Sequence, residues 1–347
     1  MTTTWISDDG EPIDKKISIY GWLLLFTRGG AIIFVITIGL FFKFFLRLFE
    51  KPLFRDKRPL SPHITVLVSR ISLWILSIPV KRFGFPLEKA GALVANHSSW
   101  LDIFALNSGQ RLYFVSKSEV AKWPGIGLLA KATGTLFIRR EAKRAVVQKK
   151  LFEQRIKMGH RLLFFPEGTS TDGMRVLPFK SALFQAFFDL NLNSECFIQP
   201  VTVTYFAPIN EDHRFYGWWG DMSFTVHLLK TIASRRQGSI EIKYHDPLLV
   251  SDFSKRKDIP KASSDVLTKL TWGPPRGAIT NIKKPGSAIG WLLENNILVA
   301  LDSHTVALPR EFGIKLRGGK IHKELITKAG DLDGKKIEQK QIDLAAI

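Results

Sequence analysis

The sequence predicts an α/β fold, in which a mixed β-sheet flanked by helices is preceded by an N-terminal membrane-associated helical segment. Two observations support this prediction. Apolar residues concentrate between residues 22 and 42, and from residue 91 onward short apolar runs alternate with amphipathic stretches. The chain has 347 residues and 45% hydrophobic content, which is enough to bury a sizeable core.

The N-terminal apolar segment runs without a charge from Gly29 to Phe42, and it extends back to Trp22 if Arg28 snorkels. A spanning helix needs about 20 apolar residues, so the segment either crosses the membrane or lies in its interface. By the positive-inside tendency, the chain after residue 43 is expected at the cytoplasmic face of the inner (cell) membrane. The flanking charges behind this expectation are Asp8, Asp9, Glu11 and Asp14 before the segment, and Lys43, Arg47, Lys51, Arg55, Lys57 and Arg58 after it.

A second apolar segment from Ile64 to Val80 is expected to form another helix, either touching the membrane or buried in the protein. The alternating part of the chain predicts strands at 91–95, 112–116, 134–138, 161–165, 197–205 and 239–244. Helices are expected at 99–107, 124–132, 141–158 and 180–189. The resulting division is an acidic segment (1–17), membrane-associated helices (18–85), an α/β domain (86–269) and a C-terminal appendage without an assigned role (270–347).

The strongest chemical signal follows the first strand of the α/β domain, in the string Asn-His-Ser-Ser-Trp-Leu-Asp that contains His97 and Asp102. A neutral imidazole can take a proton from an alcohol that attacks a carbonyl, provided that a carboxylate fixes its tautomer. Residues five apart within one helix point about 140° apart, so His97 must lie on the turn before the helix. Ser99 is a favoured N-cap, and Ser-x-x-Asp is also a capping box, which gives Asp102 a purely structural alternative.

Three further segments carry groups suited to a polar head group. A basic pair at the end of a strand presents guanidinium groups that suit a phosphate. A turn rich in hydroxyls and backbone donors follows the strand at 161–165, and a lysine begins the next helix. The residues are Arg139 and Arg140 in the basic pair, Glu167, Gly168 and Thr169 in the turn, and Lys180, with Pro200 in a neighbouring strand.

In their order and spacing, these motifs resemble the glycerolipid acyltransferases, in particular the bacterial 1-acylglycerol-3-phosphate acyltransferases. The resemblance covers about residues 91–247 and implies a catalytic domain at 86–269. It implies transfer of a fatty acyl group from acyl carrier protein or a coenzyme A thioester to the free sn-2 hydroxyl of 1-acylglycerol-3-phosphate, forming phosphatidic acid. No cofactor or metal is expected. The residues implied are His97 and Asp102 in catalysis, and Arg139, Glu167, Gly168 and Thr169 in binding the acceptor.

One departure from the family pattern concerns the acceptor. Many members continue Glu-Gly-Thr with Arg-Ser, whereas this chain has Ser170 and Thr171, so a cation expected near the phosphate is missing. Lys180, Arg175 and Arg140 are candidates to replace it. The gap also leaves open a different acceptor, so a lyso-ornithine lipid O-acyltransferase with the same His-Asp chemistry is the alternative prediction.

Other classes fit the sequence less well. The 50 basic and 31 acidic residues give a formal charge of +19, which suits either nucleic acid or an acidic membrane surface. The apolar N-terminal segment favours membrane lipids, so no nucleic-acid partner is expected. Serine-hydrolase and metal-site spacings are absent from the sequence. Cys196, the single cysteine, is expected in the core.

Overall fold

Two compact units, Met1–Trp272 and Gly273–Ile347, divide the chain. The structure, a computed structural model, describes residues 4–7, 10–12, 16–138, 145–181, 183–184, 187, 196–253 and 258–268 of the first unit. Of the second unit it describes five short strands, β9 (Ile297–Val299), β10 (Thr305–Ala307), β11 (Gly313–Arg317), β12 (Lys320–Glu324) and β13 (Lys340–Ile342). They form an antiparallel pair, β9 with β10, and a three-stranded antiparallel sheet with β12 in the middle.

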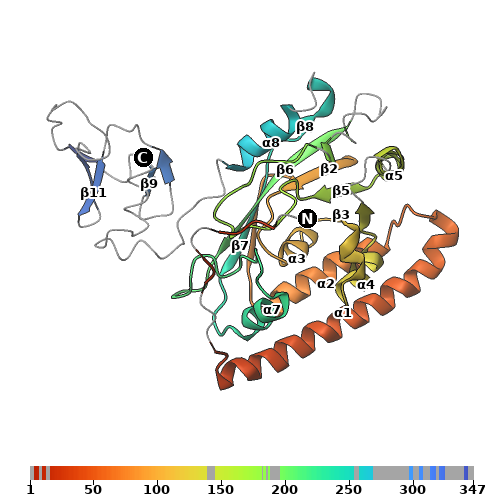
Figure 1. The fold of residues 1–347 in the computed structure, drawn as a ribbon, viewed down its shortest axis with the longest axis horizontal. Helices are drawn as coiled ribbons and strands as arrows, with labels where there is room; N and C mark the ends of the chain where they lie inside the picture. Colours follow the sequence, from red (N-terminus) through yellow and green to blue (C-terminus); the bar gives the residue numbers. More distant parts are fainter. Residues whose placement is uncertain are drawn as a thin grey trace. The chain divides into compact units, whose positions relative to one another are not determined.

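The first unit is built on a mixed sheet (Figure 1). Its strands are β1 (Val80–Phe83), β2 (Gly91–Ala95), β3 (Tyr113–Lys117), β4 (Leu136–Ile138), β5 (Arg161–Phe164), β6 (Phe197–Phe206), β7 (Ser239–Tyr244) and β8 (Leu248–Leu249). They lie in the order β1-β7-β6-β2-β5-β3-β4, and β8 pairs with β6. Strands β6, β2, β5, β3 and β4 are parallel, whereas β7 and β8 are antiparallel to β6. The carboxyl ends of β2 and β5 therefore meet at one edge of the sheet.

Helices cover both faces of this sheet. They are α1 (Ile19–Phe54), α2 (Ser61–Ile75), α3 (Asp102–Asn107), α4 (Ile126–Thr133), α5 (Ala145–Lys157), α7 (Phe224–Ala233) and α8 (Asp258–Thr268). Side chains alternate along each strand, so Leu93 of β2 joins the core beneath α2, α3 and α7, whereas Val94 joins the core shared with α5 and α8. The sheet is thus buried on both faces, as its continuous apolar strands require.

Helix α1 is the long apolar helix that the sequence predicts. It has 36 residues, and it is the one helix among the described residues that is long and apolar enough to cross a membrane. Most of its large apolar side chains face outward, including Phe26, Ile33 and Phe34, whose exposed fractions are 71%, 67% and 65%. An apolar surface of this extent on one helix is typical of a membrane-associated segment.

Helix α2 packs against α1 and shows where the expectation for the second apolar segment was wrong (Figure 1). The helix ends at Ile75, and Val80 begins strand β1 instead of continuing the helix. Ser77, two residues after the helix end, has a positive φ of 59°, and Pro79 has no N–H to donate, so the helix does not continue through them. At the other end, Glu50 of α1 accepts hydrogen bonds from the backbone N–H groups of Leu60 and Ser61, which stabilises the start of α2.

The predicted strands agree with the structure more closely than the predicted helices do. All six predicted strands are present within two residues of their expected ends, and Cys196 is buried as expected. The helices expected at 99–107 and 124–132 are shorter in the structure. The helix expected at 141–158 is described from Ala145 and ends at Lys157, and half of the helix expected at 180–189 lies outside the described residues. The sequence reading did not predict β1, β8, α7 or α8.

Candidate active site

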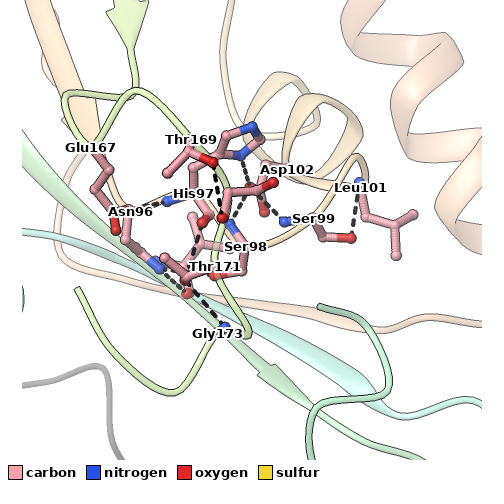
Figure 2. Close-up of polar contacts among 12 residues, drawn as sticks. Asn96, His97, Ser98, Ser99, Leu101, Asp102, Glu167, Thr169, Thr171 and Gly173 are labelled. Carbon is pink, nitrogen blue, oxygen red and sulfur yellow. Dashed lines mark hydrogen bonds and ion pairs between the residues drawn. The ribbon is translucent and has the colours of Figure 1, made fainter. Parts of the chain in front are cut away.

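The site begins at the carboxyl end of β2, where the chain enters the loop before α3 (Figure 2). Asn96 fixes the first residue of this loop, because its side-chain amide donates to the carbonyl of Val203 at 2.9 Å and accepts from the Val203 N–H at 2.8 Å. The side chain thereby extends the pairing between β2 and β6 by one step after the backbone pairing ends at Ala95. His97 follows at once, outside the helix, as its spacing from Asp102 required.

His97 and Asp102 form the central contact of the site. The Nδ1 atom of His97 lies 2.7 Å from Oδ2 of Asp102, as Figure 2 shows. The same oxygen accepts the backbone N–H groups of Ser98 at 3.0 Å and Ser99 at 3.1 Å. Asp102 is the first residue of α3 and is fully buried, so its carboxylate is held in one position.

The capping box that was the structural alternative for Asp102 is formed only in part. The structure begins α3 at Asp102, after Leu101, so the expectation that the helix starts directly after Ser99 was wrong. The hydroxyl of Ser99 still accepts the N–H of Leu101 at 3.3 Å, as an N-cap side chain does. The bonds from Ser98 and Ser99 to Asp102 nevertheless close the loop as a capping carboxylate does. One oxygen of Asp102 therefore holds both the loop and the imidazole.

Tyr205 is a partner of Asp102 that the sequence reading did not identify. Its hydroxyl donates to Oδ1 of Asp102 at 2.5 Å, from the part of β6 that continues beyond the end of β2. Burial, followed by the nearby charge of Asp102, raises the pKa of Tyr205 well above its usual value. The hydroxyl consequently stays protonated and donates a hydrogen bond to the carboxylate. Both oxygens of Asp102 therefore accept hydrogen bonds.

Glu167 connects the loop of His97 to the loop that follows β5. Its two carboxylate oxygens accept the backbone N–H of His97 and the backbone N–H of Leu177, each at 2.8 Å. The residue is 1% exposed, and burial raises the pKa of Glu167 to about 8. Both oxygens of Glu167 are thus engaged by the backbone, and the expectation that Glu167 binds the acceptor stays a prediction. Its carboxylate positions the loop that carries His97.

The turn after Glu167 lies beside His97. The backbone N–H of Thr171 donates to the carbonyl of His97 at 2.9 Å, and Gly168 adopts a φ of +76°, which favours glycine. Thr169 is half-buried, and its hydroxyl accepts the N–H of Trp5 at 3.5 Å. The N-terminal segment thus reaches the turn that the sequence assigned to the acceptor.

One face of the His97 imidazole is covered by an aromatic ring, and the side chain remains partly exposed. Phe165 stacks on the ring with a centroid distance of 4.0 Å and an interplanar angle of 11°. The side chain of His97 is 20% exposed, whereas that of Asp102 is completely buried. No described residue forms a hydrogen bond with Nε2, which leaves that atom available to a substrate.

The cationic side chains expected near the acceptor have different surroundings. Arg175 lies on the turn and bonds to the buried carboxylate of Asp172 at 3.0 Å, with its guanidinium 5.1 Å from the ring centre of Trp5. Lys180 is exposed, and its backbone N–H donates to the carbonyl of Pro166 at 2.9 Å. Arg139 and Arg140 lie outside the described residues, directly after the end of β4.

Comparisons with known proteins agree with this geometry. Residues 81–204 match the family model described as Acyltransferase. A lyso-ornithine lipid O-acyltransferase from Rhodobacter capsulatus is 53% identical over 258 residues, which cover 74% of this chain and 93% of that protein. A protein of the same description from Brucella abortus is 31% identical over 210 residues, or 56% and 78% of the two chains. A 1-acyl-sn-glycerol-3-phosphate acyltransferase from Neisseria meningitidis is 39% identical over 107 residues, or 30% of this chain and 42% of that protein.

The match to the family model spans the segments that carry His97, Asp102 and Glu167, and the relative from Rhodobacter capsulatus is matched over nearly its whole length. The family resemblance seen in the motifs is therefore confirmed. This chain belongs to the glycerolipid acyltransferase family and is an acyltransferase that acts on lysolipids.

Proposed function

We propose that this chain transfers a fatty acyl group from a thioester donor to the free hydroxyl of a lyso-ornithine lipid. The observation that carries the acceptor assignment is the 53% identity to a lyso-ornithine lipid O-acyltransferase along 93% of that protein. The sequence supports the same choice, because Ser170 stands where many phosphate-binding relatives have arginine. The donor is an acyl carrier protein or coenzyme A thioester.

His97 is the general base of the proposed reaction. Its Nδ1–H donates to Asp102, so Nε2 carries the lone pair that accepts the proton of the acceptor hydroxyl. As the proton leaves, the hydroxyl oxygen bonds to the thioester carbonyl carbon, and the buried carboxylate stabilises the imidazolium. The carbon–sulfur bond then breaks, and the departing thiolate takes the proton from Nε2. The products are an ester and a free thiol, and no acyl-enzyme forms.

Acylation of 1-acylglycerol-3-phosphate is the second candidate function. It is favoured by the 39% identity to the Neisseria meningitidis protein, which spans 107 residues. Its phosphate would have to be held by the cations that the sequence offers for this role, Arg139, Arg140, Arg175 or Lys180. Both candidates use the same His97–Asp102 chemistry and differ only in the group that holds the acceptor.

The active site is proposed to face the cytoplasm. Basic residues follow the apolar part of α1, and the cytoplasmic side of a membrane retains such residues. Both classes of thioester donor are soluble carriers, which is consistent with a site on that side. Labelling of an exposed residue of the first unit in sealed inverted membrane vesicles tests this placement; labelling only from the opposite side would contradict it.

An acyl-transfer assay on purified membranes tests the proposed function. Lyso-ornithine lipid and 1-acylglycerol-3-phosphate are offered in parallel, each with an acyl carrier protein and a coenzyme A donor. The expected result is turnover of lyso-ornithine lipid with the higher kcat/KM, abolished by His97→Ala and unchanged by His63→Ala, which removes an exposed histidine of α2. Exclusive turnover of 1-acylglycerol-3-phosphate would overturn the acceptor assignment, and full activity of His97→Ala would overturn the mechanism.

A further inference from the structure

A pocket lies at the far end of α3, away from the reacting groups. It has a volume of about 390 Å³, within the range of about 300–1,000 Å³ that is typical of ligand sites. Helix α3 begins with Asp102 in the active site and ends at Asn107, next to this pocket. The lining comes from the second half of α2, the turn before β1, β1 itself and Ser108, and it includes Arg70, Trp74, Ser77, Val80 and Arg82.

Two guanidinium groups converge in this pocket. Arg70 donates its Nε–H to the carbonyl of Ser108 at 2.7 Å, and Arg82 donates an Nη2–H to the hydroxyl of the same residue at 2.5 Å. Each arginine thus uses one donor at the carboxyl end of α3, where the Arg70 bond to a carbonyl acts as a cap. A guanidinium has five N–H donors, so most of them remain directed elsewhere.

The charge in the pocket is unbalanced. None of the described lining residues is acidic. Partial desolvation of its guanidinium, together with the neighbouring charge of Arg70, lowers the pKa of Arg82. An anion between the two groups would relieve their repulsion, and paired guanidinium groups suit the oxygens of a phosphate.

The pocket also adjoins the surface that faces the membrane. Trp74, one of its lining residues, is 79% exposed, and Leu67 on the same helix is 57% exposed. Arg28 of α1 contacts the hydroxyl of Ser77 at 3.5 Å, which places the apolar helix beside the lining. Tryptophan and arginine side chains are common on protein surfaces that lie at the level of the lipid head groups.

We infer that the pocket between α2, β1 and the end of α3 binds the phosphate of an anionic membrane phospholipid. The bound head group would hold the first unit against the bilayer at a point separate from the active site. This role does not depend on which lysolipid the enzyme acylates.

Vesicle binding tests the inference with the full chain. Wild-type protein is mixed with phosphatidylcholine vesicles containing either no phosphatidylglycerol or a fixed fraction of it. The anionic vesicles should bind more strongly, and Arg70→Ala/Arg82→Ala should reduce this preference about 25-fold, since each arginine near an anionic surface contributes about fivefold. Binding to pure phosphatidylcholine should change little, because α1 provides it.

Two matched variants separate a built site from diffuse surface charge. Lys81→Ala removes an exposed charge next to Arg82 that does not line the pocket, and it should lose less than Arg82→Ala. Arg70→Lys/Arg82→Lys keeps both charges but not the planar forks, and it should not restore wild-type binding. Equal losses in Lys81→Ala and Arg82→Ala, or full binding by the lysine variant, would overturn the inference.

The wild-type protein provides a measurement that does not depend on how the variants fold. Phosphatidylglycerol with a photoreactive group beside its phosphate should label the segment from Trp74 to Arg82, and labelling confined to other segments would contradict the site. In detergent, phosphatidylglycerol should raise the melting temperature more than inorganic phosphate does. Equal effects of the two would identify a site for free phosphate and overturn the lipid assignment.

Discussion

The substitution Asp102→Asn tests the central contact of the active site with a side chain of the same size and shape. Oδ2 of Asp102 accepts the backbone N–H groups of Ser98 and Ser99, so the carbonyl oxygen of an asparagine must take this place. The amide nitrogen then replaces Oδ1 and faces Tyr205, whose hydroxyl can turn and accept. The carbonyl oxygen still accepts the Nδ1–H of His97, so this variant keeps the tautomer and removes only the charge.

The size of the effect follows from that geometry. Two unit charges about 4 Å apart interact by about 4 kcal/mol at an effective dielectric constant of 20. Nδ1 and Oδ2 are 2.7 Å apart and the carboxylate is fully buried, so an interaction of this size stabilises the imidazolium. Its loss lowers kcat about 10³-fold at 1.36 kcal/mol per factor of ten. A triad in which the same change locks the wrong tautomer loses about 10⁴-fold, so the expected loss here is smaller.

The thiol released in each turnover provides a continuous assay for this variant. We expect kcat to fall about 10³-fold while the KM values for donor and acceptor stay close to wild type, because Asp102 is buried. Asp246→Asn, which removes an exposed carboxylate, is the matched control and should leave kcat unchanged. A loss below about tenfold would mean that Asp102 only caps the loop, and a loss equal to that of His97→Ala would refute the retained tautomer.

Tyr205, Glu167 and Arg139 provide three further tests of the site. Tyr205→Phe leaves Oδ1 of the buried Asp102 without its donor, so the free energy of unfolding should fall by about 1–3 kcal/mol in a denaturant titration, and an unchanged value would remove Tyr205 as a positioning residue. The folded-state pKa of Glu167 is raised to about 8, so the folded protein binds more protons than the unfolded chain between the two pKa values. Its contribution to stability is therefore present below the unfolded pKa and lost as pH rises through about 8, and Glu167→Gln should flatten this dependence in melting curves. Arg139→Ala, predicted from the sequence alone, should raise the acceptor KM more than it lowers kcat, and unchanged acceptor saturation would discard that role.

Local patterns determined much of this protein. Apolar composition identified α1, because a long run of apolar residues can be recognised without knowing what the helix contacts. Alternating apolar runs identified the strands of the parallel part of the sheet. The spacing of His97 and Asp102 placed the histidine before the helix, because helical geometry forbids their contact within one helix.

Tertiary structure decided the contacts between residues distant in the chain. Tyr205 reaches Asp102 only because β6 lies next to β2 and continues beyond it, and the register of that pairing also brings Val203 opposite the side chain of Asn96. Glu167 turned inward because two backbone N–H groups, from loops 80 residues apart at His97 and Leu177, needed an acceptor in a buried place. Residue types and local spacing specify which groups are available, whereas strand order and register fix which of them meet. The sequence therefore predicted the catalytic groups of this site, but it did not predict the hydrogen-bond network that positions them.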